Sequence, residues 1–284
     1  MNHCCISIRK LRQSMISVSL ETSESMNTLN PALLSIFAKA VYLKRYGKEN
    51  EHYANATDSL VDWGDKTSTN VSEWNVMEID GNKETGVGTA FGGFAAVAYK
   101  NSITNEIVIA FRGTDSPLDV LISDAQIAFN LTPQQASAAN AFYNRIATDN
   151  PSSTISATGH SLGGALAQFV AASNHISAVT FNAPGVNMPT NGDASKIINY
   201  VNMNDFIGCL NSHLGETRYY LPDGKYMDNE FKPHSDYINQ NFENYKTLPE
   251  GYEWTFGNAI ALWGYDIQNK NAKQKFLLSP FVTE

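Results

Sequence analysis

The segment ISATGHSLGGALA, residues 155–167, constrains the fold more strongly than any other part of the chain. It starts with a short apolar run, passes through a Gly-x-Ser-x-Gly pentapeptide centred on Ser161, and continues into a stretch rich in Ala and Leu. The pentapeptide alone is a weak signal, since chance produces it roughly 0.1 times in a chain like this one. A strand before it and a helix after it make it specific, because the serine of a nucleophile elbow sits on a strained strand-to-helix turn. We therefore expect a strand to end and a helix to begin at Ser161.

The expected helix after Ser161 also predicts part of an oxyanion hole. The first amides of a helix lack intrahelical acceptors and point along the positive end of the helix dipole. The amide of Leu162, directly after Ser161, is therefore placed to donate to an oxygen that becomes negative when the serine attacks a carbonyl.

The rest of the chain alternates between apolar strands and helical stretches. Residues 107–111 (IVIAF) are apolar without a break, as expected of a strand buried on both faces. Asn30 and Pro31 suit the N-cap and the first position of a helix. The predicted strands cover residues 74–80, 89–100, 107–111, 155–158, 178–182 and 197–202, and the predicted helices cover residues 30–46, 132–149 and 162–174. Such alternation predicts an α/β fold with a central, mostly parallel sheet flanked by helices.

Composition excludes several classes of protein. With 284 residues, 43% of them hydrophobic and 17% charged, the chain can bury a sizeable core and differs from a disordered protein. Its 28 acidic residues outnumber its 20 basic ones, for a net charge of −8, and without a basic cluster we expect no nucleic-acid partner. No run of about 18 apolar residues occurs, so we expect no transmembrane segment. Three cysteines do not suggest a disulfide framework.

The chain is expected to form one domain over residues 26–284, preceded by a flexible segment over residues 1–25. Met15 and Met26 both fit a translation start, which places this segment outside the expected domain. The basic residues near the N-terminus are not followed by an apolar stretch of signal-peptide length. We therefore expect a cytoplasmic location or secretion by a signal-less route, between which the sequence does not decide.

A serine nucleophile needs a histidine as its base and a carboxylate that orients the histidine. In this fold class the carboxylate and then the histidine follow the serine along the chain. His160 lies inside the elbow and cannot turn back onto Ser161, and His175 ends the expected helix. The remaining candidates are His213 and His234. His234 is favoured because it follows polar turn residues and precedes an apolar stretch, as in a loop that reaches the sheet edge.

The carboxylate is expected directly after a strand that follows the elbow. Asp205 follows the predicted strand over residues 197–202 and is the favoured acid. Asp193 precedes that strand, so it would lie at the opposite edge of a parallel sheet. Asp223 and Asp228 fall in polar loops and are the less favoured alternatives.

These segments together resemble the class 3 lipase family, which includes filamentous-fungal triacylglycerol lipases, feruloyl esterases and bacterial phospholipases A1. The matching motifs occur in the family's order and are IVIAFRGT (107–114), GHSLGG (159–164), FNAPG (181–185), VNMNDF (201–206) and PHSDYI (233–238). The resemblance implies an α/β-hydrolase fold. It also implies that Thr114 supplies an oxyanion-hole amide beside Leu162, and it supports His234 as the base.

The chain departs from the fungal members of this family after Thr114. Residues 119–121 (DVL) stand where those members carry a Trp. The connection to Gly159 is shorter and lacks the Cys- and Gly-rich part of their lid. The apolar residues within 118–129 fit a small mobile cover and a buried connector equally well, so the resemblance does not imply interfacial activation.

The resemblance implies a serine carboxylic-ester hydrolase that acts on lipid acyl esters, with triacylglycerol as the favoured substrate. A phospholipase A1, a short-chain carboxylesterase or a feruloyl esterase uses the same catalytic parts and stays open, as does an inactive lipid-binding module. No metal-site spacing stands out and we expect no cofactor, although Asp- and Asn-rich loops leave a structural Ca²⁺ open. The negative net charge disfavours docking on anionic lipid, so a transient contact with a lipid interface would have to be apolar.

Overall fold

The computed structural model describes residues 29–42, 56–80, 94–113, 133–202, 205, 207–220, 232–235, 237–238, 240, 242–243 and 245. Within them, seven strands form one sheet in the order of the chain. The antiparallel part consists of β1 (Trp74–Asp80), β2 (Ala96–Asn101) and β3 (Ile107–Phe111). From β3 the sheet continues in parallel pairing through β4 (Ile155–His160), β5 (Ser177–Phe181), β6 (Ile197–Asn202) and β7 (Glu216–Tyr220).

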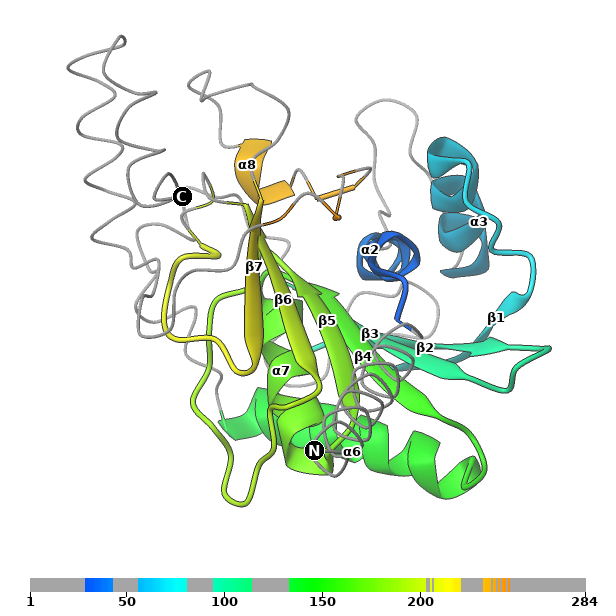
Figure 1. Cartoon of the computed structure of the whole chain (residues 1–284). Coiled ribbons are helices and arrows are strands. Elements are labelled where there is room, and N and C mark those ends of the chain that lie inside the picture. The colour runs from blue at the N-terminus through cyan, green and yellow to red at the C-terminus, as the bar shows by residue number, and fades with distance from the viewer. Residues whose placement is uncertain are drawn as a thin grey trace, which may run out of the picture.

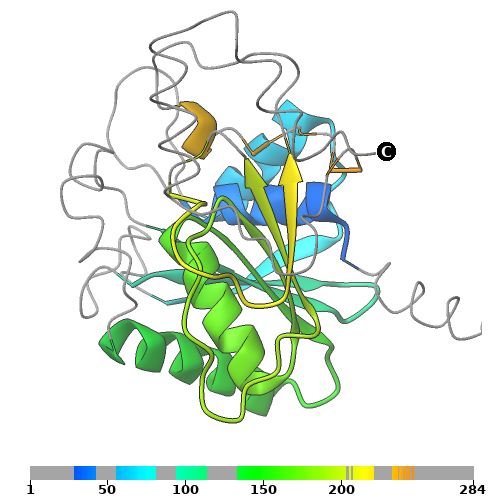
Figure 2. The same ribbon diagram turned by 60° about the vertical axis from the view of Figure 1, so that its left-hand side comes forward.

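Helices cover both faces of this sheet (Figure 1, Figure 2). On one face α2 (Pro31–Ala40) packs against β3, β4 and β5, and α3 (Ala56–Thr67) packs against α2. On the other face α7 (Leu162–Asn174) packs against the same strands, with α6 (Pro133–Asp149) beside it. A mostly parallel sheet between two layers of helices is the predicted architecture, and the fold is that of an α/β-hydrolase.

Strand residues alternate between two hydrophobic cores, as the pleat of a sheet requires. On β3, Val108 and Ala110 join the core beneath α2. Ile107, Ile109 and Phe111 join the core beneath α6 and α7. All five residues are buried, which confirms the prediction that this strand is covered on both faces.

The helix α2 begins where the sequence predicts but ends earlier. The side chain of Asn30 caps it by accepting a hydrogen bond from the backbone N–H of Ala32 at 3.0 Å. The helix ends at Ala40, several residues before the predicted end. The buried hydroxyl of Ser59, on α3, donates to the carbonyl of Ala40 at 2.8 Å, so contact with the next helix satisfies this end of α2.

The carboxyl ends of β3, β4, β5 and β6 meet at one edge of the sheet, because these strands are parallel neighbours. The short helix α8 (Lys232–Ser235) returns to this edge (Figure 1). There the carbonyl of His234 accepts a hydrogen bond from the side chain of His160, at the end of β4. In open α/β sheets, ligands bind in the crevice outside this edge. The edge therefore holds the described candidates from the end of β4, from the turn after β6 and from α8.

Three described elements were not predicted from the sequence: α3, β7 and α8. The sequence of α3 (ATDSLVDWGDKT) is mostly polar and contains Gly64, so it does not stand out as an apolar helix. The strand β7 (ETRYY) contains two charged residues and lacks a strong apolar pattern. Of the predicted strand over residues 89–100, the structure describes residues 94–100, in which β2 begins at Ala96. The expected flexible segment over residues 1–25 and the expected cover within residues 118–129 lie outside the described residues. Across the described ranges, none of the helices is long and apolar enough to cross a membrane.

Candidate active site

Ser161 occupies the turn between β4 and α7, as the sequence predicts. Its backbone angles are φ 58° and ψ −133°, a conformation that a non-glycine residue adopts only under strain of about 1–3 kcal/mol. The carbonyl of Ser161 accepts hydrogen bonds from Gly164 at 2.9 Å and from Ala165 at 3.2 Å, and these bonds hold the turn. The side chain of Ser161 does not cap α7, so its hydroxyl is not committed to the helix.

Two glycines pack this turn against the end of β3. A Cβ atom added at Gly163 would lie 2.1 Å from the carbonyl oxygen of Phe111, so only glycine lets α7 approach β3 this closely. A Cβ atom added at Gly113 would lie 3.2 Å from the Cβ atom of Ser161. The chain that leaves β3 therefore passes directly beside the serine.

Of the two predicted oxyanion donors, the structure describes Leu162. Leu162 is the first residue of α7 and is buried, and its N–H has no acceptor within the helix. Thr114 follows Gly113 but lies outside the described residues. The position of Leu162 agrees with the expected donor, and the roles of both residues stay predictions.

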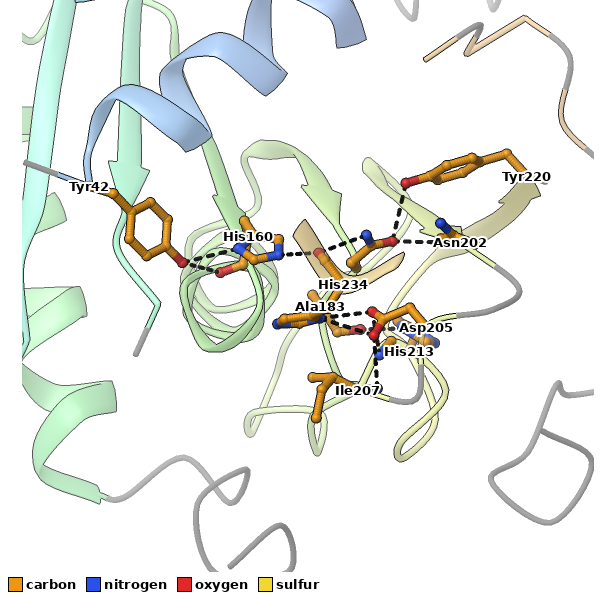
Figure 3. Close-up of polar contacts among 11 residues, drawn as sticks. Tyr42, His160, Ala183, Asn202, Asp205, Ile207, His213, Tyr220 and His234 are labelled. Carbon is orange, nitrogen blue, oxygen red and sulfur yellow. Dashed lines mark hydrogen bonds and ion pairs between the residues drawn. The ribbon is translucent and has the colours of Figure 1, made fainter. Parts of the chain in front are cut away.

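His234 and Asp205 form a buried pair (Figure 3). The Nδ1 atom of His234 lies 3.0 Å from each carboxylate oxygen of Asp205. A carboxylate accepts hydrogen bonds, so Nδ1 carries a proton, and a neutral ring then has its lone pair on Nε2. In the part of the chain that the structure describes, Nε2 has no hydrogen-bond partner. The structure thus brings the predicted acid and the predicted base together.

Backbone amides orient the carboxylate of Asp205. Its Oδ1 atom accepts a hydrogen bond from the N–H of Ile207 at 3.1 Å, and its Oδ2 atom accepts one from Gly208 at 2.9 Å. The N–H of Asp205 itself donates to the carbonyl of Asn202, the last residue of β6, at 2.8 Å. This tight turn keeps the carboxylate at the sheet edge and directs both of its oxygens toward His234.

The main chain of His234 is tied to the ends of β4 and β5. Its carbonyl accepts a hydrogen bond from Nε2 of His160 at 2.6 Å and one from Nδ2 of Asn182 at 3.0 Å. The Oδ1 atom of Asn182 accepts the backbone N–H of Asn202 at 2.8 Å, which extends the network to β6 (Figure 3). The rings of His160 and His234 lie 4.5 Å apart between centroids, so the predicted base stands beside the residue that precedes Ser161.

The alternative candidates for the base and the acid do not form a comparable pair among the described residues. The Nε2 atom of His213 donates to the carbonyl of Ala183 at 2.8 Å, so the nitrogen that would serve a serine is engaged elsewhere. Asp193 lies before β6, at the opposite edge as expected, and its Oδ1 atom accepts the N–H of Ser195 at 2.9 Å. Two further candidate aspartates lie outside the described residues: Asp223 and Asp228.

Three polar residues that hold His234 in place were not recognised from the sequence: Tyr42, His160 and Asn182. His160 was considered as a base and set aside, whereas its observed contact is to a main-chain carbonyl far along the chain. Asn182 is fully buried with φ 47°. An asparagine directly after a buried strand was the available signal, because a buried amide needs hydrogen-bond partners.

The described residues do not offer a metal site. No group of three or more His, Cys, Asp or Glu side chains that could hold a metal ion occurs among them. The Asn- and Asp-rich loop over residues 223–229 lies outside the described part of the chain. The structure therefore does not test the structural Ca²⁺ that the sequence leaves open there.

Solved structures with a similar fold include three fungal lipases. The lipase of Rhizomucor miehei in complex with its propeptide is 16% identical over 72% of this chain and 70% of that chain, with a TM-score of 0.44. The Lip2 lipase of Yarrowia lipolytica is 16% identical over 69% and 78%, with a TM-score of 0.43. Lipase II of Rhizopus niveus is 15% identical over 70% and 82%, with a TM-score of 0.45.

A comparison with the curated proteins finds no match. A family model described as the Tle-like phospholipase domain, of the phospholipase-like type, matches residues 36–203. This match covers more than half of the chain and includes the whole turn around Ser161. The chain therefore belongs to the phospholipase-like family of the Tle-like phospholipase domain, and it is an ester-hydrolysing enzyme.

Proposed function

We propose that the chain hydrolyses the acyl esters of glycerophospholipids, with Ser161 as nucleophile, His234 as base and Asp205 as the residue that orients the base. The observation that carries this proposal is the buried pair of Asp205 and His234 at the sheet edge where the strained Ser161 turn lies. Serine hydrolases use these three groups in these roles.

The proposed reaction has two steps. In the first, Oγ of Ser161 attacks the ester carbonyl while Nε2 of His234 takes the hydroxyl proton. The imidazolium gives this proton to the oxygen of the leaving lysolipid, and Asp205 stabilises the charge through Nδ1–H. In the second step, His234 takes a proton from water, which attacks the carbonyl of the acyl-enzyme. The imidazolium then gives this proton to Oγ of Ser161 as the ester bond breaks, which releases the fatty acid and restores the serine hydroxyl and the neutral base.

The amides of Leu162 and Thr114 are the proposed oxyanion donors. The N–H of Leu162, the first residue of α7, has no acceptor within the helix and directly follows Ser161. The approach of Gly113 to Ser161 supports Thr114, because Thr114 is the next residue along the chain. A donor of this kind contributes about 2.7–4 kcal/mol in the transition state.

The family match supports a phospholipid as the substrate. The resemblance to class 3 lipases favours triacylglycerol, which stays the second candidate. The net charge of −8 disfavours an anionic lipid surface. Phosphatidylcholine, whose headgroup is zwitterionic, is therefore the phospholipid to test first.

The test compares fatty-acid release from phosphatidylcholine in mixed micelles with release from a trioctanoin emulsion. We expect faster release from phosphatidylcholine, and a loss of at least about 10⁴-fold in Ser161→Ala. Ser173→Ala is the matched control, because among the described residues the Ser173 hydroxyl bonds only the carbonyl of Phe169 on the same helix, at 2.8 Å, and activity should not change. The lysolipid that accumulates identifies which acyl position is cleaved.

A different result would overturn each of the proposed nucleophile, base and substrate. Hydrolysis retained by a folded Ser161→Ala variant would overturn the nucleophile. Loss of turnover in His213→Ala but not in His234→Ala would overturn the base. Faster release from trioctanoin would replace phospholipid by triacylglycerol as the substrate. A wild-type protein that hydrolyses neither lipid and is not labelled by a fluorophosphonate would be a lipid-binding module instead.

A further inference from the structure

A line of three hydrogen bonds connects the end of β3 with the main chain of His234. It begins at the backbone N–H of Gly113, which lies 3.0 Å from the hydroxyl oxygen of Tyr42. The same hydroxyl lies 3.1 Å from Nδ1 of His160. The Nε2 atom of His160 lies 2.6 Å from the carbonyl oxygen of His234 (Figure 3). The line therefore joins the chain beside Ser161 to the residue proposed as the base.

The groups at the two ends of this line of hydrogen bonds, the N–H of Gly113 and the carbonyl of His234, determine which atom donates in each bond. A backbone amide only donates and a carbonyl only accepts, so Gly113 donates to Tyr42 and Nε2 of His160 donates to His234. In a neutral ring, Nδ1 keeps its lone pair and accepts the hydroxyl proton of Tyr42. A charged His160 would carry a proton on both nitrogens, and the hydroxyl of Tyr42 would then have to turn to the carbonyl of His160, 3.3 Å away.

The surroundings of His160 favour the neutral ring. Burial holds the pKa of His160 well below its ordinary value of 6.5, and the nearby His234 and Lys39 lower it further. The hydrogen bond to the carbonyl of His234 acts in the opposite direction and is the smallest of these effects. The ring of Tyr237 also stacks on that of His160, with 4.4 Å between centroids. Burial raises the pKa of Tyr237, so its hydroxyl is neutral and adds no charge beside His160.

We propose that His160 is a positioning residue, which as a neutral ring with its proton on Nε2 fixes the main chain of His234 and couples it through Tyr42 to the chain at Gly113. This inference rests on the proposed role of His234 as the base. His234 belongs to α8, a helix of four residues that is too short to be stable without external contacts. Its carbonyl has one further donor among the described residues, Nδ2 of Asn182.

Losing the His160 donor would therefore shift the imidazole of His234 relative to the serine and to Asp205. A displacement of about 1 Å in a catalytic group costs on the order of 10²-fold in rate. The loss should appear in kcat, because the displaced group moves a proton and does not bind the substrate. KM should stay nearly unchanged.

Replacing His160 by Gln and by Leu separates the hydrogen bond from the packing. Gln places an amide N–H near the position of Nε2 and can still donate to the carbonyl of His234, whereas Leu fills space without a donor. For a soluble p-nitrophenyl ester, we expect kcat to fall about 10²-fold in His160→Leu and less than about tenfold in His160→Gln. The same two substitutions at His175, the exposed C-cap of α7, are matched controls and should keep the wild-type kcat.

The coupling through Tyr42 is tested by a double variant. Tyr42→Phe removes both the acceptor for Gly113 and the donor to His160, so it should also lower kcat. Because both residues act on one network, the loss in Tyr42→Phe/His160→Leu should be smaller than the product of the two single losses. Independent losses that multiply would overturn the coupling.

Nitrogen-15 spectra of the imidazoles test the protonation state without any substrate. His160 should show one protonated and one unprotonated ring nitrogen, and the His234 signals should change in His160→Leu but not in His160→Gln. An imidazolium at His160 near neutral pH, equal losses of kcat in both variants, or a change in KM alone would overturn the proposal. If His160→Leu fails to fold, the wild-type spectrum and the comparison of His160→Gln with Tyr42→Phe decide the question.

The two proposals can fail separately. A wild-type protein that reacts with neither esters nor a fluorophosphonate would overturn the proposed function. The ring-nitrogen signals of His160 and His234 would then still show whether His160 holds His234 as a neutral donor. Conversely, an active enzyme whose kcat does not respond to His160→Leu would keep its function and lose this positioning residue.

Discussion

Replacing Asp205 by Asn is the sharpest test of the acid, because the structure defines what each oxygen of this carboxylate does. Both oxygens lie 3.0 Å from Nδ1 of His234, and each also accepts one backbone N–H, from Ile207 or from Gly208. Asn offers one oxygen and one NH₂ group in the same place. Whichever way the amide turns, its NH₂ group meets a backbone N–H that needs an acceptor.

Two losses of known size follow from this geometry. A buried donor left without its acceptor costs about 1–3 kcal/mol, so the free energy of unfolding should fall by that amount. An NH₂ group facing Nδ1 also forces the ring proton of His234 onto Nε2, where the ring can no longer accept the proton of Ser161. In serine triads this substitution lowers kcat by about 10⁴-fold, which corresponds to about 5 kcal/mol in the barrier.

The assay measures kcat and KM on a soluble ester together with urea unfolding of the same preparations. We expect a loss of about 10⁴-fold in kcat for Asp205→Asn, with KM changed little. Asp193→Asn is the matched control, since Asp193 precedes β6 at the opposite edge of the sheet and its carboxylate accepts a hydrogen bond within its own turn, from the N–H of Ser195. A folded Asp205→Asn variant that keeps kcat within tenfold of wild type would refute the reasoning that Asp205 orients the base.

Three further predictions concern the packing around the site. Gly163→Ala should destabilise the fold by about 1–3 kcal/mol and abolish fluorophosphonate labelling, because its Cβ atom would collide with the carbonyl of Phe111; normal labelling and melting would contradict the close approach of α7 to β3. The free energy of unfolding of the wild type should fall as the pH drops below 6.5. In this range His160 is protonated in the unfolded chain but stays neutral in the folded chain, where its pKa is lowered, so protonation stabilises the unfolded state. His160→Gln lacks this group, so its denaturation curves should depend less on pH in the same range, and identical pH dependences would contradict a buried neutral ring. Tyr237→Phe should keep or raise stability by up to about 1–3 kcal/mol in urea unfolding, because the buried hydroxyl of Tyr237 has no hydrogen-bond partner among the described residues; a clear loss of stability would mean that this hydroxyl has a partner.

The sequence predicts the serine turn well because its constraints are local. A strand, a strained turn and a helix follow one another within residues 155–167, so periodicity and glycine spacing are enough to predict both ends of the turn at Ser161. The position of Asp205 also follows from local sequence. Asp205 comes shortly after the strand β6, which is recognisable from its apolar residues, and the parallel sheet places the end of β6 at the same edge as Ser161. His234 was separated from His213 by loop context and family resemblance, and the structure pairs His234 with Asp205.

The supporting residues could not be predicted because their contacts are long-range and go mostly to the main chain. The partner of His160 is a carbonyl, which every residue possesses, so nothing in the sequence marks it. Tyr42 accepts the N–H of Gly113 from a position just after α2, far earlier in the chain, so no local pattern marks this contact. The unpredicted strand β7 lies at the end of the sheet, where only its last two residues are buried and the apolar pattern is correspondingly weak.

The way in which His234 is held shows how the matched part of the chain can position a proposed base that lies outside it. The family match ends at residue 203, whereas Asp205 and His234 follow it. Both side chains that hold the carbonyl of His234, those of His160 and Asn182, lie inside the matched region. Because they bind a main-chain carbonyl, they require no particular side chain from the segment that carries the base. The ends of β4 and β5 can therefore receive base-carrying segments of different sequence, provided that each presents a carbonyl at this position and an imidazole within reach of Asp205.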